Sequence, residues 1–315
     1  MIDIKLLEQL CLCNGISGDE GNVRNLIINE IKDCADDIKT DNLGNLIVFK
    51  KGKKSAKSKL MVSAHMDEVG LMVTDITSDG YLKFDEVGGI DRRVLPGKRV
   101  CVGRNGLNGV IGVKPIHLTN GDEKTAVPKM NDMYIDIGAE SREDALKYVN
   151  YGDGINFEGD FKINGKTVVT KALDDRFGCY VLINLIKSEP EYDMYFTFVV
   201  QEEVGLRGAR SAAFTVNPDF ALVIESTTAA DVAEVDASHQ VCNLSKGATV
   251  TVMDRATVYD KEMISAAFEL AEKNNIAVQY KRAVAGGNDS GAIHQSRGGV
   301  RTLAVSLPSR YIHAP

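Results

Sequence analysis

The feature that most constrains the fold is an alternation of short apolar runs with amphipathic segments after residue 166. The apolar runs have the length and β-branched content of buried strands, and most are followed by a segment with helical spacing. Such an alternation predicts an α/β layer with helices on both faces of one sheet. The predicted strands are Thr167–Thr170, Tyr195–Gln201, Phe220–Ile224, Ala248–Met253, Ile276–Lys281 and Thr302–Ser306. The predicted helices are Asp175–Lys187, Leu206–Phe214, Asp260–Asn274 and Asp289–Gln295.

The N-terminal segment has the same combination of amphipathic helical spacing and short apolar runs, so we assign it to the same domain. Residues 4–13 and 20–35 show amphipathic helical spacing, and Ser17 with Glu20 matches a capping box for the second helix. A hairpin and a buried strand are expected next, at Lys39–Lys50 and Leu60–Ala64.

Between these two stretches the sequence changes to short alternating strands with many glycines, which predicts a small β-barrel or sandwich. We therefore expect one discontinuous α/β domain, residues 1–68 and 166–315. A β-rich domain, residues 69–165, is expected to be inserted into it.

Net charge and aromatic content argue against several classes of partner. The 315 residues carry a formal charge of −7, which disfavours nucleic acid or an anionic membrane. Tryptophan is absent, so base-stacking platforms are not expected. No run approaches the roughly 18 apolar residues of a membrane span, and no signal peptide is recognisable. The six cysteines form no CxxC pair, and we expect them to be reduced in a cytoplasmic protein.

Potential metal ligands follow five strand-like runs. Ligands of open α/β sheets bind beyond the carboxyl ends of the strands, so side chains at these positions are expected to converge. Two imidazoles with several carboxylates suit Zn²⁺, Co²⁺ or Mn²⁺, and a pair of such ions needs a bridging carboxylate. The residues are His65, Asp174-Asp175, Glu202-Glu203, Glu225 and His313.

Each of these residues also has an ordinary structural interpretation. A single His65 is more often a hydrogen-bonded core histidine, and an aspartate pair before an apolar helix could be an N-cap. Glu202 and Glu203 could belong to a solvated turn; their side chains would diverge in a strand, so one could bind metal while the other acts as a base. Asp67 could orient His65, as metal-bound histidines usually require. The coincidence of five such positions favours a metal centre.

Several segments, in order along the whole chain, carry a family resemblance: SAHMDEVG, KALDDRFGCYV, VVQEEVGLRGA, VIESTTAAD and GGNDSGAIHQSRGGVRT, then RYIHAP. They resemble the cytosolic dinuclear metallo-aminopeptidases of the tetrahedral, deblocking and glutamyl aminopeptidase group, often labelled cellulase M or endoglucanase. The resemblance implies a phosphorylase/hydrolase-like three-layer α/β catalytic domain with an inserted β-barrel-like dimerisation domain. It also implies peptide substrates and homo-oligomers, with dimers assembling into a dodecamer.

The resemblance further implies a role for each candidate residue. Asp174 would bridge the two ions, Glu202 would be the general base and acid, and Asp67 would orient His65. The family more often has aspartate at the position of Glu225, and glutamate is still an oxygen ligand. The implied metal ligands are His65, Asp174 and Glu225 for one ion, and Asp174, Glu203 and His313 for the other.

The expected reaction is metal-dependent removal of N-terminal residues from peptides, with a bridging water activated by two divalent metals and Glu202 as general base. Asp289 is a candidate for lining the pocket of the substrate α-amino group; its alternative is an N-cap. Two other functions are open: a glycoside hydrolase with paired carboxylates about 5–9.5 Å apart, and a non-catalytic assembly protein on the same scaffold. The first leaves His65 and His313 unexplained, and the second leaves the whole ligand set unexplained.

Overall fold

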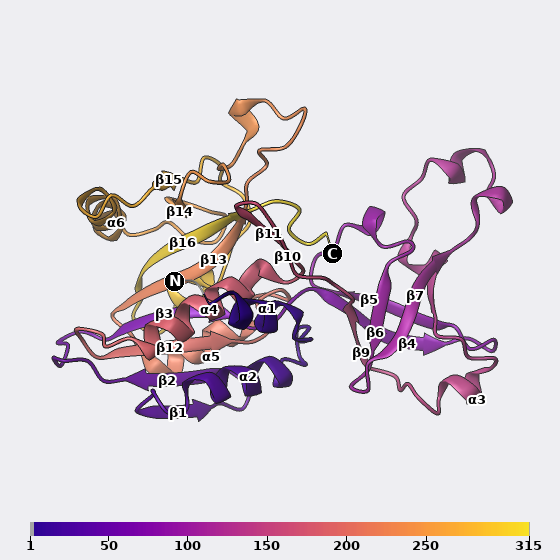
Figure 1. The fold of residues 1–315 in the computed structure, drawn as a ribbon, viewed down its shortest axis with the longest axis horizontal. Coiled ribbons are helices and arrows are strands. Elements are labelled where there is room, and N and C mark those ends of the chain that lie inside the picture. Colours follow the sequence, from indigo (N-terminus) through magenta and orange to yellow (C-terminus); the bar gives the residue numbers. More distant parts are fainter. Residues whose placement is uncertain (1–2, 315) are drawn as a thin grey trace. The chain divides into compact units, whose positions relative to one another are not determined.

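The computed structural model describes residues 3–314, apart from the side chains of residues 122 and 123. The chain divides into two compact units. The first unit runs to Asp67 and resumes from Ala172 to Ile312, and the second covers Glu68–Lys171 and includes His313. Figure 1 labels the elements of both units.

An eight-stranded sheet forms the centre of the first unit. Its four central strands, β12, β3, β13 and β16, run parallel to one another. They are apolar along most of their length, as expected of strands that are covered on both faces. In order across the sheet, the strands are β1 (Asp37–Thr40), β2 (Leu46–Lys50), β12 (Met194–Val199), β3 (Leu60–His65), β13 (Phe220–Thr228), β16 (Arg301–Ser309), β14 (Ala248–Val250) and β15 (Val278–Tyr280).

Helices cover this sheet in the three-layer arrangement that the alternating sequence predicts (Figure 1). Helix α4 (Leu173–Lys187) packs on β3 and β13, and α1 (Ile4–Leu12) and α2 (Gly21–Ile31) pack on α4. Alanines of α5 (Arg207–Val216) share another buried cluster with α7 (Ser290–Ile293) and the strands, and α6 (Lys261–Lys273) contacts β16. Among the described residues, no helix is both long and apolar enough to span a bilayer.

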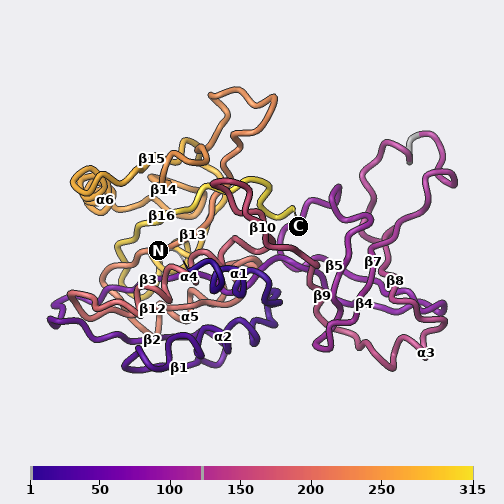
Figure 2. The backbone as a smooth tube through the Cα atoms, viewed as in Figure 1, coloured from indigo at the N-terminus to yellow at the C-terminus, as the bar shows by residue number. Residues whose placement is uncertain are grey.

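The second unit is built on a closed six-stranded barrel, which confirms the predicted β-barrel. A separate apolar core fills it, with Leu71, Phe84 and Ile155 among its buried members. The chain between β7 and β8 leaves the barrel as one long excursion (Figure 2). Around the barrel the strands are β4 (Gly70–Ile76), β5 (Leu82–Val87), β8 (Met133–Asp136), β7 (Leu107–Val113), β6 (Arg99–Val102) and β9 (Gly154–Phe157). The short helix α3 (Arg142–Ala145) and the hairpin strands β10 (Lys162–Asn164) and β11 (Thr167–Val169) complete the unit.

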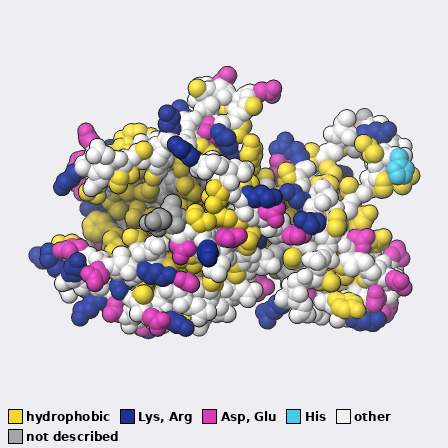
Figure 3. Space-filling view, in the orientation of Figure 1, with side chains coloured by type: hydrophobic (Ala, Val, Ile, Leu, Met, Phe, Trp, Pro, Cys, Tyr) yellow, Lys and Arg dark blue, Asp and Glu magenta, His cyan; other side chains and the backbone are white. Residues whose placement is uncertain are grey.

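Both charge signs are present on one face of each unit. On the face drawn in Figure 3, Lys and Arg side chains are interspersed with Asp and Glu side chains over each unit. A surface of mixed sign creates no extended positive field for a polyanion.

Two local predictions are wrong. Strand β11 was expected in the main sheet, but it pairs antiparallel with β10 in a separate two-stranded sheet. The capping box is also absent, because α2 begins at Gly21 and Glu20 makes no side-chain bond to the helix start. The hydroxyl of Ser17 donates to a carboxylate oxygen of Asp67 instead, at 2.6 Å. In both cases a tertiary partner replaces the local partner that the sequence pattern suggested.

Candidate metal centre

The register of the parallel strands brings the first candidate residues together. Strand β3 ends at His65, which is paired with Val199, the last residue of β12. On its other side β3 pairs with β13, with Ser63 opposite Val223. Glu225 lies two residues beyond Val223, as His65 lies two residues beyond Ser63, so both side chains reach the same edge of the sheet.

The imidazole of His65 faces two carboxylates. Its Nε2 lies 3.3 Å from Oδ1 of Asp174 and 3.4 Å from Oε1 of Glu225. Its Nδ1 lies 3.0 Å from the main-chain oxygen of Asp67. That oxygen can only accept, so Nδ1 carries the proton and Nε2 is directed at the carboxylates. Burial lowers the pKa of His65, but the carboxylates of Glu225, Asp174 and Asp67 more than reverse this and leave the pKa well above its usual value.

Asp174 and Asp175 have different surroundings, although they are neighbours in the sequence. Asp175 is fully buried, and its Oδ1 accepts the main-chain N–H of Gly178 at 3.0 Å, as an N-cap residue does. A Cβ on Gly178 would lie 2.2 Å from Oδ2 of Asp175, so this approach requires glycine. Asp174 is directed at His65 instead. The side chain of Asp175 therefore binds the main chain of the first turns, although the N-cap residue of α4 is Ala172. Asp174 joins the cluster from the start of α4 and not from the end of a sheet strand.

Glu202 and Glu203 lie in the turn after β12, and their main chain is bound to Asp67. The N–H of Glu202 donates to Oδ1 of Asp67 at 3.0 Å, and the N–H of Glu203 donates to Oδ2 at 3.1 Å. The same carboxylate lies 3.5 Å from Nδ1 of His65. Asp67 is fully buried and so connects the histidine to the two glutamates.

The donor set and its burial fit divalent cations. Ligand atoms of His65, Asp174 and Glu225 lie within 4.8 Å of one another, and so do those of His65, Glu202 and Glu203. Oε2 of Glu225 is buried and has no hydrogen-bond partner among the described residues. Burial raises the pKa of Glu202 well above its usual range and that of Glu225 to about 8, and neighbouring carboxylates add to both shifts. A bound cation would supply the missing positive charge and the missing partner for these oxygens.

Asp289 belongs to the same electrostatic neighbourhood. It is fully buried just before α7, and neither carboxylate oxygen has a hydrogen-bond partner among the described residues. Burial raises the pKa of Asp289 to about 7, and the charges of Asp67 and Glu203 contribute to that shift. Asp289 is the N-cap residue of α7, as the alternative interpretation expected, but its side chain makes no bond to the helix start, so capping does not account for its carboxylate.

His313 follows β16, whose last residue is Ser309. It is half-buried and belongs to the second unit. Its assignment as a ligand remains a prediction from the sequence.

Two further side chains hold the main chain around His65, and sequence reasoning missed both. Arg176 is fully buried, and its guanidinium donates to the main-chain oxygens of Met66 at 2.7 Å and Leu10 at 2.6 Å. The thiol of Cys179 donates to the main-chain oxygen of His65 at 3.1 Å. The only signal was position, since both residues follow Asp174 within one turn or two of α4; nothing in the sequence shows that an arginine is buried.

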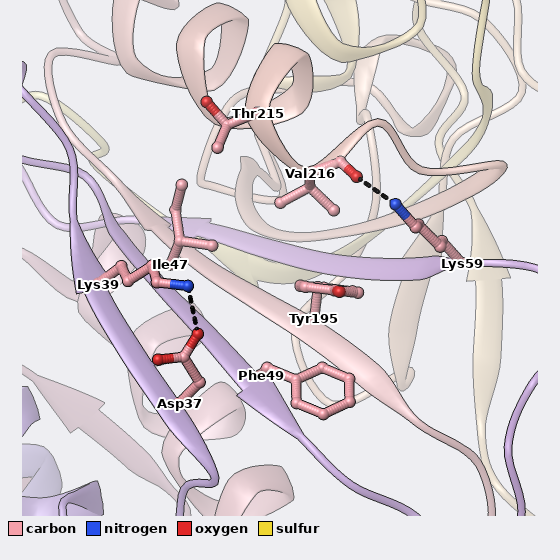
Figure 4. Close-up of a pocket in the computed structure, with 8 residues that line it drawn as sticks. All are labelled: Asp37, Lys39, Ile47, Phe49, Lys59, Tyr195, Thr215 and Val216. Carbon is pink, nitrogen blue, oxygen red and sulfur yellow. Dashed lines mark hydrogen bonds and ion pairs between the residues drawn. The ribbon is translucent and has the colours of Figure 1, made fainter.

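A separate pocket lies away from this cluster. It has a volume of about 280 Å³, and Phe49, Tyr195, Lys39 and Lys59 are among its lining residues (Figure 4). Lys59 precedes β3 and Tyr195 is near the start of β12, so the pocket lies towards the amino ends of the strands. None of the predicted site residues lines it.

A family model and several known proteins with a similar sequence and structure identify the family of this chain. The family model described as M42 glutamyl aminopeptidase matches residues 44–315. A relative from Acetivibrio thermocellus is 44% identical over 98% of this chain and 91% of its own length. The TET aminopeptidase of a marine-sediment thaumarchaeon has a TM-score of 0.94 at 34% identity, over 99% of this chain and 89% of its own. The TET1 peptidase of Pyrococcus horikoshii has a TM-score of 0.87 at 40% identity, over 99% and 92%. The chain therefore belongs to the M42 glutamyl aminopeptidase family.

Proposed function

We propose that the chain is an aminopeptidase that binds two divalent metal ions (Zn²⁺, Co²⁺ or Mn²⁺). His65, Asp174 and Glu225 would hold one ion, and Asp174, Glu203 and His313 the other, with Asp174 shared. The observation that carries this proposal is the buried cluster in which Nε2 of His65 faces two carboxylates at 3.3 and 3.4 Å. The ions would act as Lewis acids towards the substrate carbonyl and would lower the pKa of a bound water.

Glu202 is assigned as the residue that moves the proton. Its carboxylate takes a proton from the attacking water as the new C–O bond forms, and returns it to the leaving amine as the C–N bond breaks. Burial raises the pKa of Glu202, which makes its carboxylate a better acceptor of the proton from water. Asp67 fixes the main chain of Glu202 and orients His65, so it acts on the reaction through both residues.

Asp289 is assigned to the α-amino group of the substrate. An ammonium group supplies three N–H donors and a positive charge, and Asp289 has two buried carboxylate oxygens to receive them. This pairing would select peptides with a free N-terminus.

The Asp289→Asn variant is expected to raise KM about 10- to 100-fold with a much smaller change in kcat, because an amide does not pair with the ammonium charge. Steady-state kinetics on a dipeptide series measures this. Asp260→Asn is the control, because it makes the same chemical change at the start of α6. Asp260 lies near the amino end of β16, whereas the candidate site lies at the carboxyl ends of the parallel strands. A KM within twofold of wild type would remove Asp289 from the binding site.

Chelation and refilling test the proposed function as a whole. Enzyme stripped of metal by EDTA is expected to lose its activity on aminoacyl-p-nitroanilides, and to regain it when Zn²⁺, Co²⁺ or Mn²⁺ is added. The same panel of substrates reports the preferred N-terminal residue. Full peptidase activity in enzyme without detectable metal would contradict the proposal.

The glycoside hydrolase alternative has no support in the site. Paired carboxylates alone would not require an imidazole between them, yet Nε2 of His65 faces both Asp174 and Glu225. Chelator-resistant release of reducing sugar from a soluble glucan would reverse this conclusion.

We further infer that the chain forms homo-oligomers, with the barrel unit in the dimer contact and dimers assembling into a dodecamer. The Pyrococcus horikoshii TET1 peptidase, which is described as a tetrahedron or a large octahedral shell, supports this inference. Light scattering on the purified chain gives the mass that decides it.

A further inference from the structure

Three consecutive main-chain amides, those of residues 201–203, donate to two buried carboxylates. The N–H of Gln201 donates to Oε1 of Glu20 at 3.1 Å. The N–H groups of Glu202 and Glu203 donate to the two oxygens of Asp67 at 3.0 and 3.1 Å. The turn that presents both glutamates is therefore fixed from outside by side chains distant in the sequence.

The turn needs this support, because Gln201 has a φ of +56°. A residue other than glycine adopts this left-handed conformation only at a cost, and it persists where surrounding contacts determine it. The amide of Gln201 is the one that Glu20 binds, so the bond from Glu20 acts at the strained residue itself. The direction in which Glu202 leaves the strand follows from that conformation.

The two carboxylates are themselves held by the segment between α1 and α2. Ser17 donates its hydroxyl to Oδ2 of Asp67 at 2.6 Å, and the N–H of Gly18 donates to Oε1 of Glu20 at 2.7 Å. Only 4% of Glu20 and 5% of Ser17 are exposed. The side chain of Glu20 makes no bond to the helix that follows it, so this buried carboxylate binds the distant turn and does not cap α2.

We propose that Ser17 and Glu20 are positioning residues for the reaction, which set the orientation of Glu202 and Glu203 through the amides of residues 201–203. The inference rests on the proposed function, because it assigns importance to the placement of Glu202. Neither residue touches the substrate or a metal ion in this scheme. Glu20 acts through Gln201, and Ser17 acts through Asp67.

The Glu20→Ala and Glu20→Gln variants separate this role from general support of the fold. Glu20→Gln keeps an oxygen that accepts both N–H groups, whereas Glu20→Ala removes it. At saturating metal, Glu20→Ala is expected to lower kcat about 10- to 100-fold with KM and bound metal within about twofold of wild type, and Glu20→Gln is expected to recover most of that loss. Each variant is tested by steady-state kinetics, by elemental mass spectrometry for its metal content, and by hydrogen exchange of the amides of residues 201–203.

Ser17→Ala is the second variant, and it is needed if Glu20→Ala does not fold. It removes only a hydroxyl group, so this variant is expected to fold. At saturating metal it is expected to lower kcat about tenfold with metal content unchanged. Asp260→Ala serves as the control; it removes a carboxylate that accepts the N–H of Met263 near the amino end of β16, and it should leave kcat unchanged.

Two results would overturn the inference. One is a kcat within twofold of wild type in both Glu20→Ala and Ser17→Ala. The other is a loss in Glu20→Ala that Glu20→Gln does not reverse. Failure of the proposed function has a different signature, namely a wild-type enzyme without chelator-sensitive peptidase activity, which would overturn both proposals.

Discussion

The Glu202→Gln enzyme is expected to retain its metal ions and to lose about 10³-fold in kcat. Glutamine has nearly the same shape, but its amide neither takes a proton from water nor returns one to an amine, and general acid–base catalysis contributes about 10²–10⁴-fold. The main-chain bond from residue 202 to Asp67 does not depend on the side chain, so the turn should keep its place. Pre-steady-state and steady-state kinetics on metal-saturated enzyme measure the loss, and elemental analysis confirms the metal content.

Glu203→Gln is the matched comparison, because it makes the same chemical change one residue away. If Glu203 binds metal and Glu202 moves the proton, Glu203→Gln should weaken metal retention and should be partly rescued by excess metal, whereas Glu202→Gln should not be. Full peptidase activity in Glu202→Gln with both ions bound would contradict the assigned mechanism. Rescue of both variants by metal would show that the two glutamates do not divide the roles as proposed.

The sequence was sufficient to predict the fold class and the residues at the ends of parallel strands. The apolar runs before His65 and Glu202 are continuous, because β3 and β12 are buried on both faces, and such runs are visible without a structure. Parallel pairing then fixes which ends meet. His65 and Glu225 lie close together because of the register between β3 and β13. The sequence pattern suggests that these strands pair, but it does not determine which residues are paired.

What the sequence could not supply depends on long-range hydrogen bonds. The Ser17 and Glu20 pair had the spacing of a capping box, but one residue binds Asp67 and the other binds the amide of Gln201. These partners lie 50 and 181 residues away in the sequence. Local patterns report local partners, so a buried polar group that serves a distant turn is misassigned.

The route by which Asp174 reaches the cluster was also misassigned, because the run before it looked like a strand of the main sheet. The run folds as a hairpin with β10, and Asp174 is presented by the first residues of α4, where φ and ψ are not helical. The hydrophobic period identified a strand, and it did not identify which strand it pairs with.

The second large effect is expected at this residue: Asp174→Asn should lose both ions and nearly all activity. As the proposed shared ligand, Asp174 contributes to both sites, and its Oδ1 lies 3.3 Å from Nε2 of His65. An amide removes that negative charge and one of its two metal-binding oxygens. Because substitution of outer partners alone costs about 10- to 100-fold in metal affinity or activity, the loss at a shared ligand should exceed about 100-fold. Metal titration by calorimetry and retention of metal after gel filtration measure it.

Asp175→Asn is the control that the chain itself offers, one peptide bond away. Asparagine keeps an oxygen for the N–H of Gly178, so α4 should still begin correctly and both ions should remain bound. Equal metal loss in the two variants would mean that Asp174 acts by supporting the helix start, and the shared-ligand assignment would fail. Metal loss that is confined to Asp174→Asn would show that the two aspartates have different functions, as their different contacts suggest. The same chemical change would then matter only at the residue whose carboxylate faces His65.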